Sequence, residues 1–198
     1  VRIKALESLG QNDNPEAMPV VRNAMNDPEP QVKYAATLSL LELAGESWLQ
    51  ELSGIIGRTS GVTLQQVLRG FFHATNYLKI NVAKSKAADM MIDALETALL
   101  DDLEEVRKAV IWPLSWMRHE RTPQILRKTY NLERSLEVKT EIVRVACSLI
   151  SDITGGTAQE LAVVDAILQD ALASSNPQLK EAALDVVKNR ELAAAVKH

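Results

Sequence analysis

The feature that most constrains the fold of this chain is an aliphatic register that recurs along its length. An aliphatic residue opens a segment, and apolar residues follow four and eight positions later. Residues at this spacing share one face of an α-helix, so each occurrence predicts a helix with one buried stripe. The clearest triplets are Val32, Ala36 and Leu40; Val106, Val110 and Leu114; Val138, Ile142 and Ala146; and Leu179, Ala183 and Val187.

Two further triplets extend the register toward the N-terminus. They are Val1, Ala5 and Leu9, and, with a looser fit, Leu64, Leu68 and Phe72. Successive triplets then open 31 to 42 residues apart. One helical hairpin consumes about that length, so the register predicts an all-α stack of about five to six hairpins. We expect residues 1–198 to form a single repeat domain, and the start within the register at Val1 indicates a fragment of a longer protein.

Helix boundaries are marked by capping residues and by proline. Asn or Thr followed by Pro favours a helix start, because the side chain caps the free amides and proline suits the first turn. Such pairs begin at Asn14, Thr122 and Asn176, while Thr157 to Glu160 reads as a capping box and Gly45 as a C-terminal stop. The expected helices lie near 1–10, 15–26, 30–44, 46–57, 62–78, 85–100, 103–118, 122–131, 135–153, 157–173 and 176–190.

Composition excludes several classes of protein. Hydrophobic residues make up 46% and charged residues 24%, which is typical of a folded globular chain. The net charge is −4 and neither half of the chain is basic, so nucleic acid is not the expected partner. No apolar run approaches the length of a membrane span. Cys147 is the only cysteine, which agrees with a cytoplasmic location.

An acid and a base recur around the start of the register helices, six positions apart. The pairs are Asp27 with Lys33, Asp101 with Arg107, and Glu133 with Lys139. An acid in the turn and a base in the following helix could link adjacent repeats through charge-assisted hydrogen bonds. The alternative is that these are solvated surface charges, which contribute little to stability.

One segment has a more specific resemblance. The residues from Asn26 to Ala36, Asn-Asp-Pro-Glu-Pro-Gln-Val-Lys-Tyr-Ala-Ala, resemble the turn and second helix of the short HEAT-like repeats of phycobiliprotein lyases and bacterial scaffold proteins. Segments 101–110 and 176–184 resemble it more distantly, and residues 46–84 fit poorly. The resemblance implies a right-handed, armadillo-type superhelical solenoid whose groove is lined by the second helix of each repeat. It implies no activity, because such repeats are defined by their packing.

Motifs that carry catalysis are missing from the sequence. There is no His-Glu-x-x-His, no paired-cysteine zinc spacing, no Walker loop and no Gly-x-Ser-x-Gly. His73 and His119 have no Ser or Cys beside them, so a nucleophile–base pair is not visible. We therefore expect no catalytic residues, no metal and no cofactor.

Residues that lie off the register on the second helices are the candidates for binding. They are Tyr34, Leu38, Leu41, Gln66, His73, Lys108, Trp112, Trp116, Thr140, Arg144, Asp185 and Lys188. Trp, Tyr and Arg are frequent anchors of protein interfaces. The predicted partner-binding groove is therefore Tyr34, His73, Lys108, Trp112, Trp116 and Arg144. The alternative is that the two tryptophans only seal adjacent repeats, and Pro113 between them is expected to kink their helix.

The function predicted from these patterns is a non-catalytic scaffold that binds a protein or peptide. Two alternatives stay open. The repeat resemblance would also suit a chromophore-handling accessory protein like the phycobiliprotein lyases. A helical-repeat DNA glycosylase would need a basic groove, which the acidic composition disfavours. The sequence does not indicate the oligomeric state.

Overall fold

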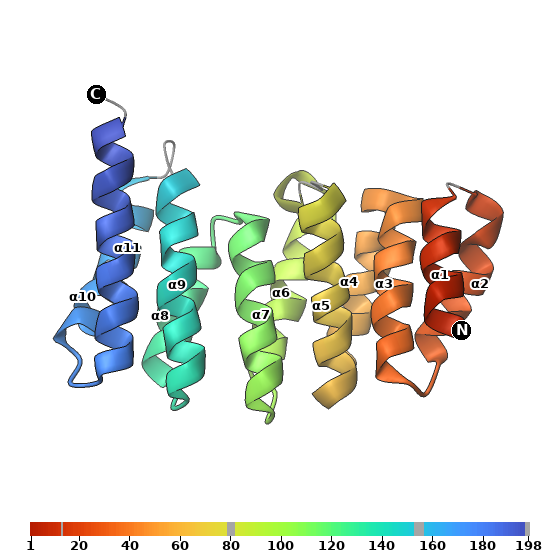
Figure 1. The fold of residues 1–198 in the computed structure, drawn as a ribbon, viewed down its shortest axis with the longest axis horizontal. Helices are drawn as coiled ribbons and strands as arrows, with labels where there is room; N and C mark the ends of the chain where they lie inside the picture. Colours follow the sequence, from red (N-terminus) through yellow and green to blue (C-terminus); the bar gives the residue numbers. More distant parts are fainter. Residues whose placement is uncertain (13, 79–81, 153–156, 197–198) are drawn as a thin grey trace. The chain divides into compact units, whose positions relative to one another are not determined.

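The computed structural model describes residues 1–12, 14–78, 82–152 and 157–196. Every regular element in these ranges is a helix, and none of the described residues forms a strand (Figure 1). The predicted all-α class is therefore confirmed. No helix in the described part of the chain is long and apolar enough to cross a membrane.

The chain divides into two compact units, Val1–Met117 and Arg118–His198. The α-helices of the first unit are α1 (Arg2–Gln11), α2 (Met18–Asn23), α3 (Pro30–Ala44), α4 (Leu49–Ile56), α5 (Gly61–Leu78), α6 (Ala88–Ala98) and α7 (Glu104–Met117). Short 3-10 turns extend this set at Pro15–Ala17, Ala24–Asn26, Gly45–Trp48 and Val82–Lys84. The helices of the second unit are α8 (Thr122–Leu132), α9 (Leu136–Asp152), α10 (Ala158–Ala173) and α11 (Pro177–Val196).

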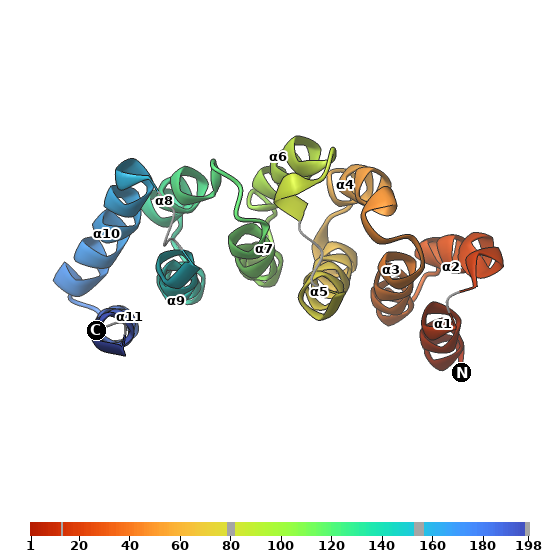
Figure 2. The same cartoon turned by 90° about the horizontal axis from the view of Figure 1, so that it is seen from above.

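The first unit consists of two layers of helices. α1, α3, α5 and α7 lie side by side in one layer, and α2, α4 and α6 form the other (Figure 2). The apolar faces of the two layers meet in a continuous core. Fully buried members of this core include Leu40, Leu52, Leu68, Ile92 and Val110. We call α1, α3, α5 and α7 the second helices, since each of the last three follows its partner in the other layer.

The second unit repeats this arrangement on a smaller scale. α9 packs against α11, while α8 and α10 lie together in the other layer. Val138 and Ile142 of α9 and Ala183 of α11 are completely buried, as the register predicts. Val164 and Ile167 supply the apolar face of α10.

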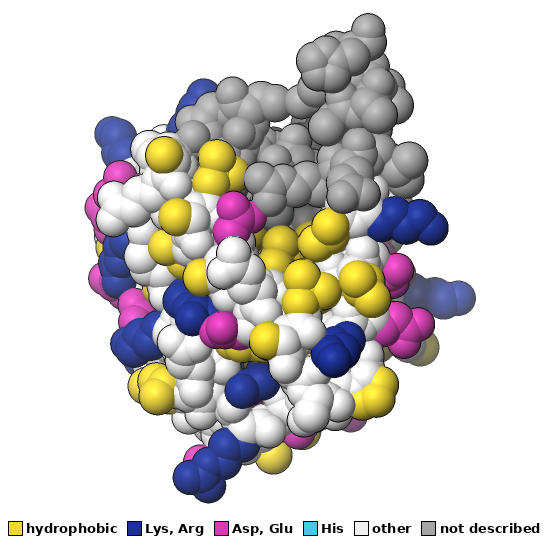
Figure 3. Space-filling model, turned by 90° about the vertical axis from the view of Figure 1, so that its left-hand side faces the viewer, with side chains coloured by type: hydrophobic (Ala, Val, Ile, Leu, Met, Phe, Trp, Pro, Cys, Tyr) yellow, Lys and Arg dark blue, Asp and Glu magenta, His cyan; other side chains and the backbone are white. Residues whose placement is uncertain are grey.

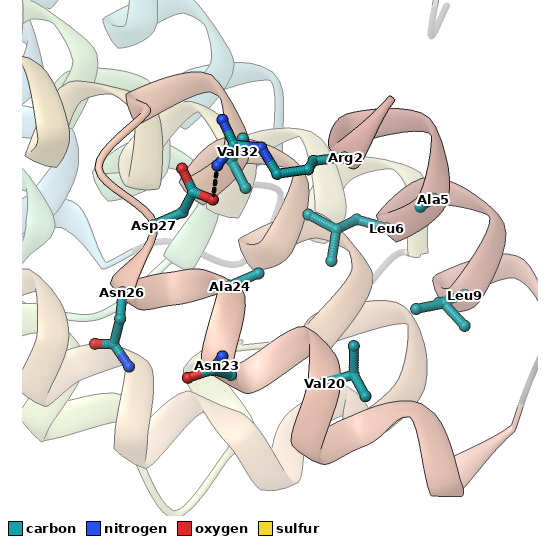
Figure 4. A pocket seen from close by; sticks show the side chains of 10 residues that line it. All are labelled: Arg2, Ala5, Leu6, Leu9, Val20, Asn23, Ala24, Asn26, Asp27 and Val32. Atoms are coloured by element: carbon teal, nitrogen blue, oxygen red, sulfur yellow. Dashed lines mark hydrogen bonds and ion pairs between the residues drawn. The ribbon is translucent and has the colours of Figure 1, made fainter.

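The register holds in α3, α7 and most of α9 and α11, but it is wrong for α1. Val1 and Ala5 are exposed and Leu9 is only half-buried, whereas Leu6 and Gly10 are buried instead. The reason is that α1 packs closely against α3, whereas an open groove lies between α2 and the side of α1 that carries Ala5 and Leu9 (Figure 4). A stripe that is apolar in the sequence is buried only where a neighbour exists.

Glycine allows neighbouring second helices to approach closely. A Cβ atom at Gly70 of α5 would lie 2.7 Å from the carbonyl oxygen of Tyr34 and 2.9 Å from Cβ of Thr37 on α3. At Gly10 of α1, a Cβ atom would lie 2.9 Å from Cα of Ser39. Glycine costs an exposed helix about 1 kcal/mol relative to alanine. Here it removes a steric barrier between two backbones.

The recurring acids cap their own turns and two of them reach back to the preceding second helix. One carboxylate oxygen of Asp101 accepts from the amide of Leu103 and the other from the amide of Gly61, both at 2.9 Å. Asp27 likewise accepts from the amide of Glu29 and forms an ion pair with Arg2 of α1. The predicted link between adjacent repeats is therefore present at these two acids.

Two of the recurring bases, Lys33 and Arg107, bind the same turns through backbone carbonyl oxygens. Nζ of Lys33 donates to the carbonyl oxygen of Met25 at 2.7 Å. Nη1 of Arg107 donates to the carbonyl oxygens of Asp101 and Asp102 at 2.9 and 3.0 Å. These bonds tie each of the two bases to its own turn.

Most predicted caps are present. Asn14 and Asn176 accept from amides of the following helix, and Thr157 with Glu160 completes the capping box. Gly45 ends α3 with a positive φ of 54°. The Thr122 cap is wrong: Thr122 is already the first residue of α8 and is buried, and the preceding Arg121 makes no side-chain cap.

Candidate functional site

Five aromatic side chains form a row across three second helices of the first unit. Tyr34 comes from α3, Phe72 and His73 from α5, and Trp112 and Trp116 from α7. We call these five residues the aromatic row. Four of the six residues predicted to line a groove belong to it, namely Tyr34, His73, Trp112 and Trp116.

Contacts between neighbouring rings connect the row from α3 to α7. The Tyr34 hydroxyl and Nδ1 of His73 share a hydrogen bond of 2.7 Å, and their rings meet edge-on with centroids 5.7 Å apart. The Phe72 ring lies 6.0 Å from Trp112 and 6.4 Å from Trp116. These separations are typical of favourable aromatic pairs. The rings therefore hold one another in place without a ligand.

The row is partly open to solvent. Trp116 is 43% exposed and His73 is exposed, while Tyr34, Phe72 and Trp112 are half-buried. Trp48, by contrast, is 1% exposed and belongs to the core. Pro113 lies inside α7 between the two tryptophans of the row, and the helix continues to Met117.

Charged side chains lie near Tyr34, at one end of the row. Burial raises the pKa of the Tyr34 phenol, with nearby Arg69 lowering it and Glu7 raising it, so a cation from α5 and an anion from α1 both lie near this ring. Burial, together with Glu7, also raises the pKa of Glu42 on α3. Lys108, another of the predicted groove residues, is half-buried on α7. Carboxylates therefore gather where α1 meets α3, and Arg69 lies on α5.

Arg144 belongs to the second unit. It lies on α9, is exposed, and its Nη1 forms an ion pair with Glu141 at 3.1 Å. The other five predicted groove residues all lie within Val1–Met117. Arg144 is therefore described with its own unit, and its membership in one common groove stays a prediction.

Three residues assigned to the outer face are buried. Leu41 and Thr140 are 0% and 1% exposed, and Gln66 is 5% exposed. The simple helical wheel treats a helix as having one buried face, but α3 and α5 are also flanked by other second helices, and α9 is flanked by α11. Its flanks are buried as well, so the outer face is narrower than the sequence suggests.

Phe72 is the member of the row that sequence reasoning missed. Its position at +8 of the loosest triplet assigned it to the core. The ring instead leans toward α7, where it contacts both tryptophans. Two features of the sequence could have indicated that Phe72 belongs to the row: it directly precedes His73, and its triplet fits the register poorly.

A groove of about 490 Å³ between α1 and α2 is a second candidate (Figure 4). Its walls are largely aliphatic, from Ala5, Leu9 and Val20, and Val20 is 61% exposed. Its charged groups, Arg2 and Asp27, are paired with each other. A small-molecule site needs a few polar groups that converge on the ligand, and here the charges already satisfy one another.

The second unit has a shallower depression of about 410 Å³ between α8 and α10. Arg127 at its edge donates to Asp170 at 2.6 Å and to the carbonyl oxygen of Ala166 at 3.2 Å. Figure 3 shows small hydrophobic areas separated by basic and acidic side chains on the α10 and α11 side. Charges of both signs interrupt this surface, so it offers no continuous apolar or basic face in that view.

The described residues were also compared with the requirements of a metal site. No group of three or more His, Cys, Asp or Glu side chains there is arranged to hold a metal ion. His73, the one histidine of the row, is engaged by the Tyr34 hydroxyl.

The paired layers of the first unit define the class, a protein built from helical repeats. Residues 1–70 match the family model of HEAT repeats. The match confirms the resemblance inferred from Asn26 to Ala36. HEAT repeats generally mediate interactions between proteins, and the family is typically non-enzymatic. No curated protein matches the chain.

Proposed function

We propose that this chain is a non-catalytic scaffold that binds a protein or peptide across the aromatic row. The observation that carries the proposal is the row itself: rings from three consecutive second helices in mutual contact, with Trp116 43% exposed. Rings that serve only the core are buried in the folded chain. The exposed part of this row can bury its apolar surface only against a partner. Aromatic residues at the centre of an interface supply much of its binding energy.

The finer architecture belongs to the same proposal. We infer a right-handed superhelical solenoid of about five to six hairpins, in which residues 1–198 act as one repeat domain. In such a stack the second helices would line the groove, and Lys108 and Arg144 would extend the contact surface. A cytoplasmic location stays a prediction from the single cysteine.

The two other functions are not favoured by a specific observation. A chromophore-handling role rests on the repeat resemblance alone. Base excision from DNA would require cations along the groove, yet Glu7 lies near Tyr34 at one end of the row. The protein scaffold therefore remains the proposal.

A double substitution tests this function directly. Trp112→Ser with Trp116→Ser removes two rings of the row, and proteins retained from a lysate of the source cells are compared with those retained by the unaltered chain. We expect loss of the retained partner while the helical circular dichroism stays nearly intact. Leu100→Ser is the matched control, because Leu100 is 81% exposed and lies outside the row.

Retention of the same partner by the double variant would refute the proposal. Unfolding of the double variant would show that the rings are core, and the site assignment would then be wrong. The Leu100→Ser control must retain the partner in either case.

A further inference from the structure

We propose that the partner of the aromatic row is an extended, acidic peptide segment whose carboxylate binds Arg69 beside an apolar anchor on the rings. This inference rests on the proposed function and adds the chemistry of the partner. It starts from Arg69, an exposed arginine near the Tyr34 ring that makes no hydrogen bond or ion pair with the described residues.

Arg69 lies on the face of α5 that carries the aromatic row. It lies three residues before Phe72 and four before His73, which places all three on neighbouring positions of one helical face. Its side chain is exposed, and its charge is felt by the Tyr34 phenol on α3. A guanidinium presents a planar fork of donors that matches a carboxylate in two parallel hydrogen bonds. The arginine and the rings thus form one surface with two kinds of recognition.

The acids near the row limit where a negative charge can bind. Glu7 of α1 lies near both Tyr34 and Glu42 of α3, since its charge helps to raise the pKa of each of these two groups. A polyanion that ran along all the second helices would meet these carboxylates and be repelled. A peptide can instead place its acid over α5 and neutral or basic residues toward α1. The charges therefore favour a peptide with a local acid over a uniformly charged nucleic acid.

The span of the row suits a short extended segment. Packed helices lie about 8–10 Å apart, so the distance from α3 to α7 is roughly 20 Å. An extended chain covers about 3.3 Å per residue, so about six residues cross the row. One apolar residue over Phe72 and Trp116 and one acid over Arg69 fit within that length.

The test is selection from a library of random peptides of about twelve residues on the immobilised chain. The unaltered chain is compared with Arg69→Glu, with Trp116→Ser and with Arg58→Glu. Arg58 is an exposed arginine of the same unit, two residues after the end of α4, so its reversal makes the same change in net charge away from the row. Circular dichroism of each variant establishes that it is folded, and selected peptides are then synthesised for affinity measurement.

We expect selected peptides to combine Asp or Glu with a nearby aromatic or aliphatic residue. Their affinity should fall about tenfold or more in Arg69→Glu, the effect of losing a charge-assisted hydrogen bond, and should fall also in Trp116→Ser. Arg58→Glu should select and bind the same peptides. Selection on Arg69→Glu should turn toward Lys and Arg.

Peptides that carry no acid but depend on Trp116 would overturn the inference and leave the proposed function standing. Acidic peptides that bind Arg69→Glu and the unaltered chain equally would also overturn it. Peptides bound equally by Trp116→Ser would remove the row from both proposals. A chain that selects no peptide would contradict the extended-segment partner, and the lysate experiment would then decide the function separately.

Discussion

Trp116 and Trp48 illustrate how one residue type serves two purposes in this chain. Trp48 is 1% exposed and packs in the core, whereas Trp116 is 43% exposed and rests on Phe72. The sequence alone could not separate them, because both occur in apolar helical surroundings. The difference arises from position in the layers: Trp48 directly precedes α4, in the layer of α2, α4 and α6, and Trp116 lies on the second helix α7.

Substitution by serine should separate the two tryptophans. Trp116→Ser is expected to change the free energy of unfolding by less than about 1 kcal/mol, since much of the ring is already in water. Trp48→Ser should cost about 3–5 kcal/mol, because a large buried ring leaves a cavity. Urea unfolding followed by circular dichroism measures both. Equal losses in the two variants would mean that Trp116 is part of the core.

Glu42 should make stability depend on pH in a defined direction. Burial first, and Glu7 second, raise the pKa of its carboxyl above the ordinary value, so the folded chain disfavours the ionised form. The stability linked to protonated Glu42 is fully present below the unfolded pKa and is lost as pH rises through the folded pKa. Glu42→Gln should therefore be more stable than the unaltered chain at pH 7.

The difference between Glu42→Gln and the unaltered chain should vanish below about pH 4, where both side chains are neutral. Thermal unfolding at the two pH values measures this change. A glutamine variant that is no more stable at pH 7 would contradict the electrostatic account of this position.

At the scale of the helix, Gly70 and Gly54 allow a direct comparison of the same substitution at two sites. Both lie inside helices, but a Cβ at Gly70 would meet the backbone of α3 at 2.7 Å, whereas at Gly54 the nearest atom is the flexible end of Arg58 at 3.5 Å. Gly70→Ala is expected to destabilise the chain by about 1–3 kcal/mol through overpacking. Gly54→Ala should stabilise it by up to about 1 kcal/mol, since alanine favours the helix.

Chemical unfolding of both alanine variants measures the contrast. If Gly70→Ala were as stable as Gly54→Ala, α3 and α5 could not approach as closely as described. The two-layer packing would then need revision.

The sequence predicted the bounds of the helices well, but it predicted less well which of their faces are buried. Capping and register fixed the bounds of α3 and α10 to within one residue, because those signals are local. The buried face of α1 was wrong, because it depends on whether a neighbour covers Ala5 and Leu9. The burial of Leu41 and Gln66 was missed for a related reason, since packing between second helices leaves no periodic trace in one sequence.

At the scale of the whole molecule, the binding surface should reside in the first unit. The aromatic row, Lys108 and Arg69 all lie within Val1–Met117. A chain of residues 1–117 is expected to unfold cooperatively and to keep the partner with little loss of affinity. Circular dichroism and a binding titration check this. Loss of the partner despite a folded fragment would give Arg144 or its unit an essential part in binding.

The most direct test of the account is site-specific photo-crosslinking to the partner. A photoreactive amino acid replaces His73 in the aromatic row in one variant and Arg22 of α2, in the other layer, in a second. We predict efficient crosslinks to the partner from position 73 and few from position 22. Crosslinks from position 22 alone would place the partner on the opposite layer and contradict binding across the second helices.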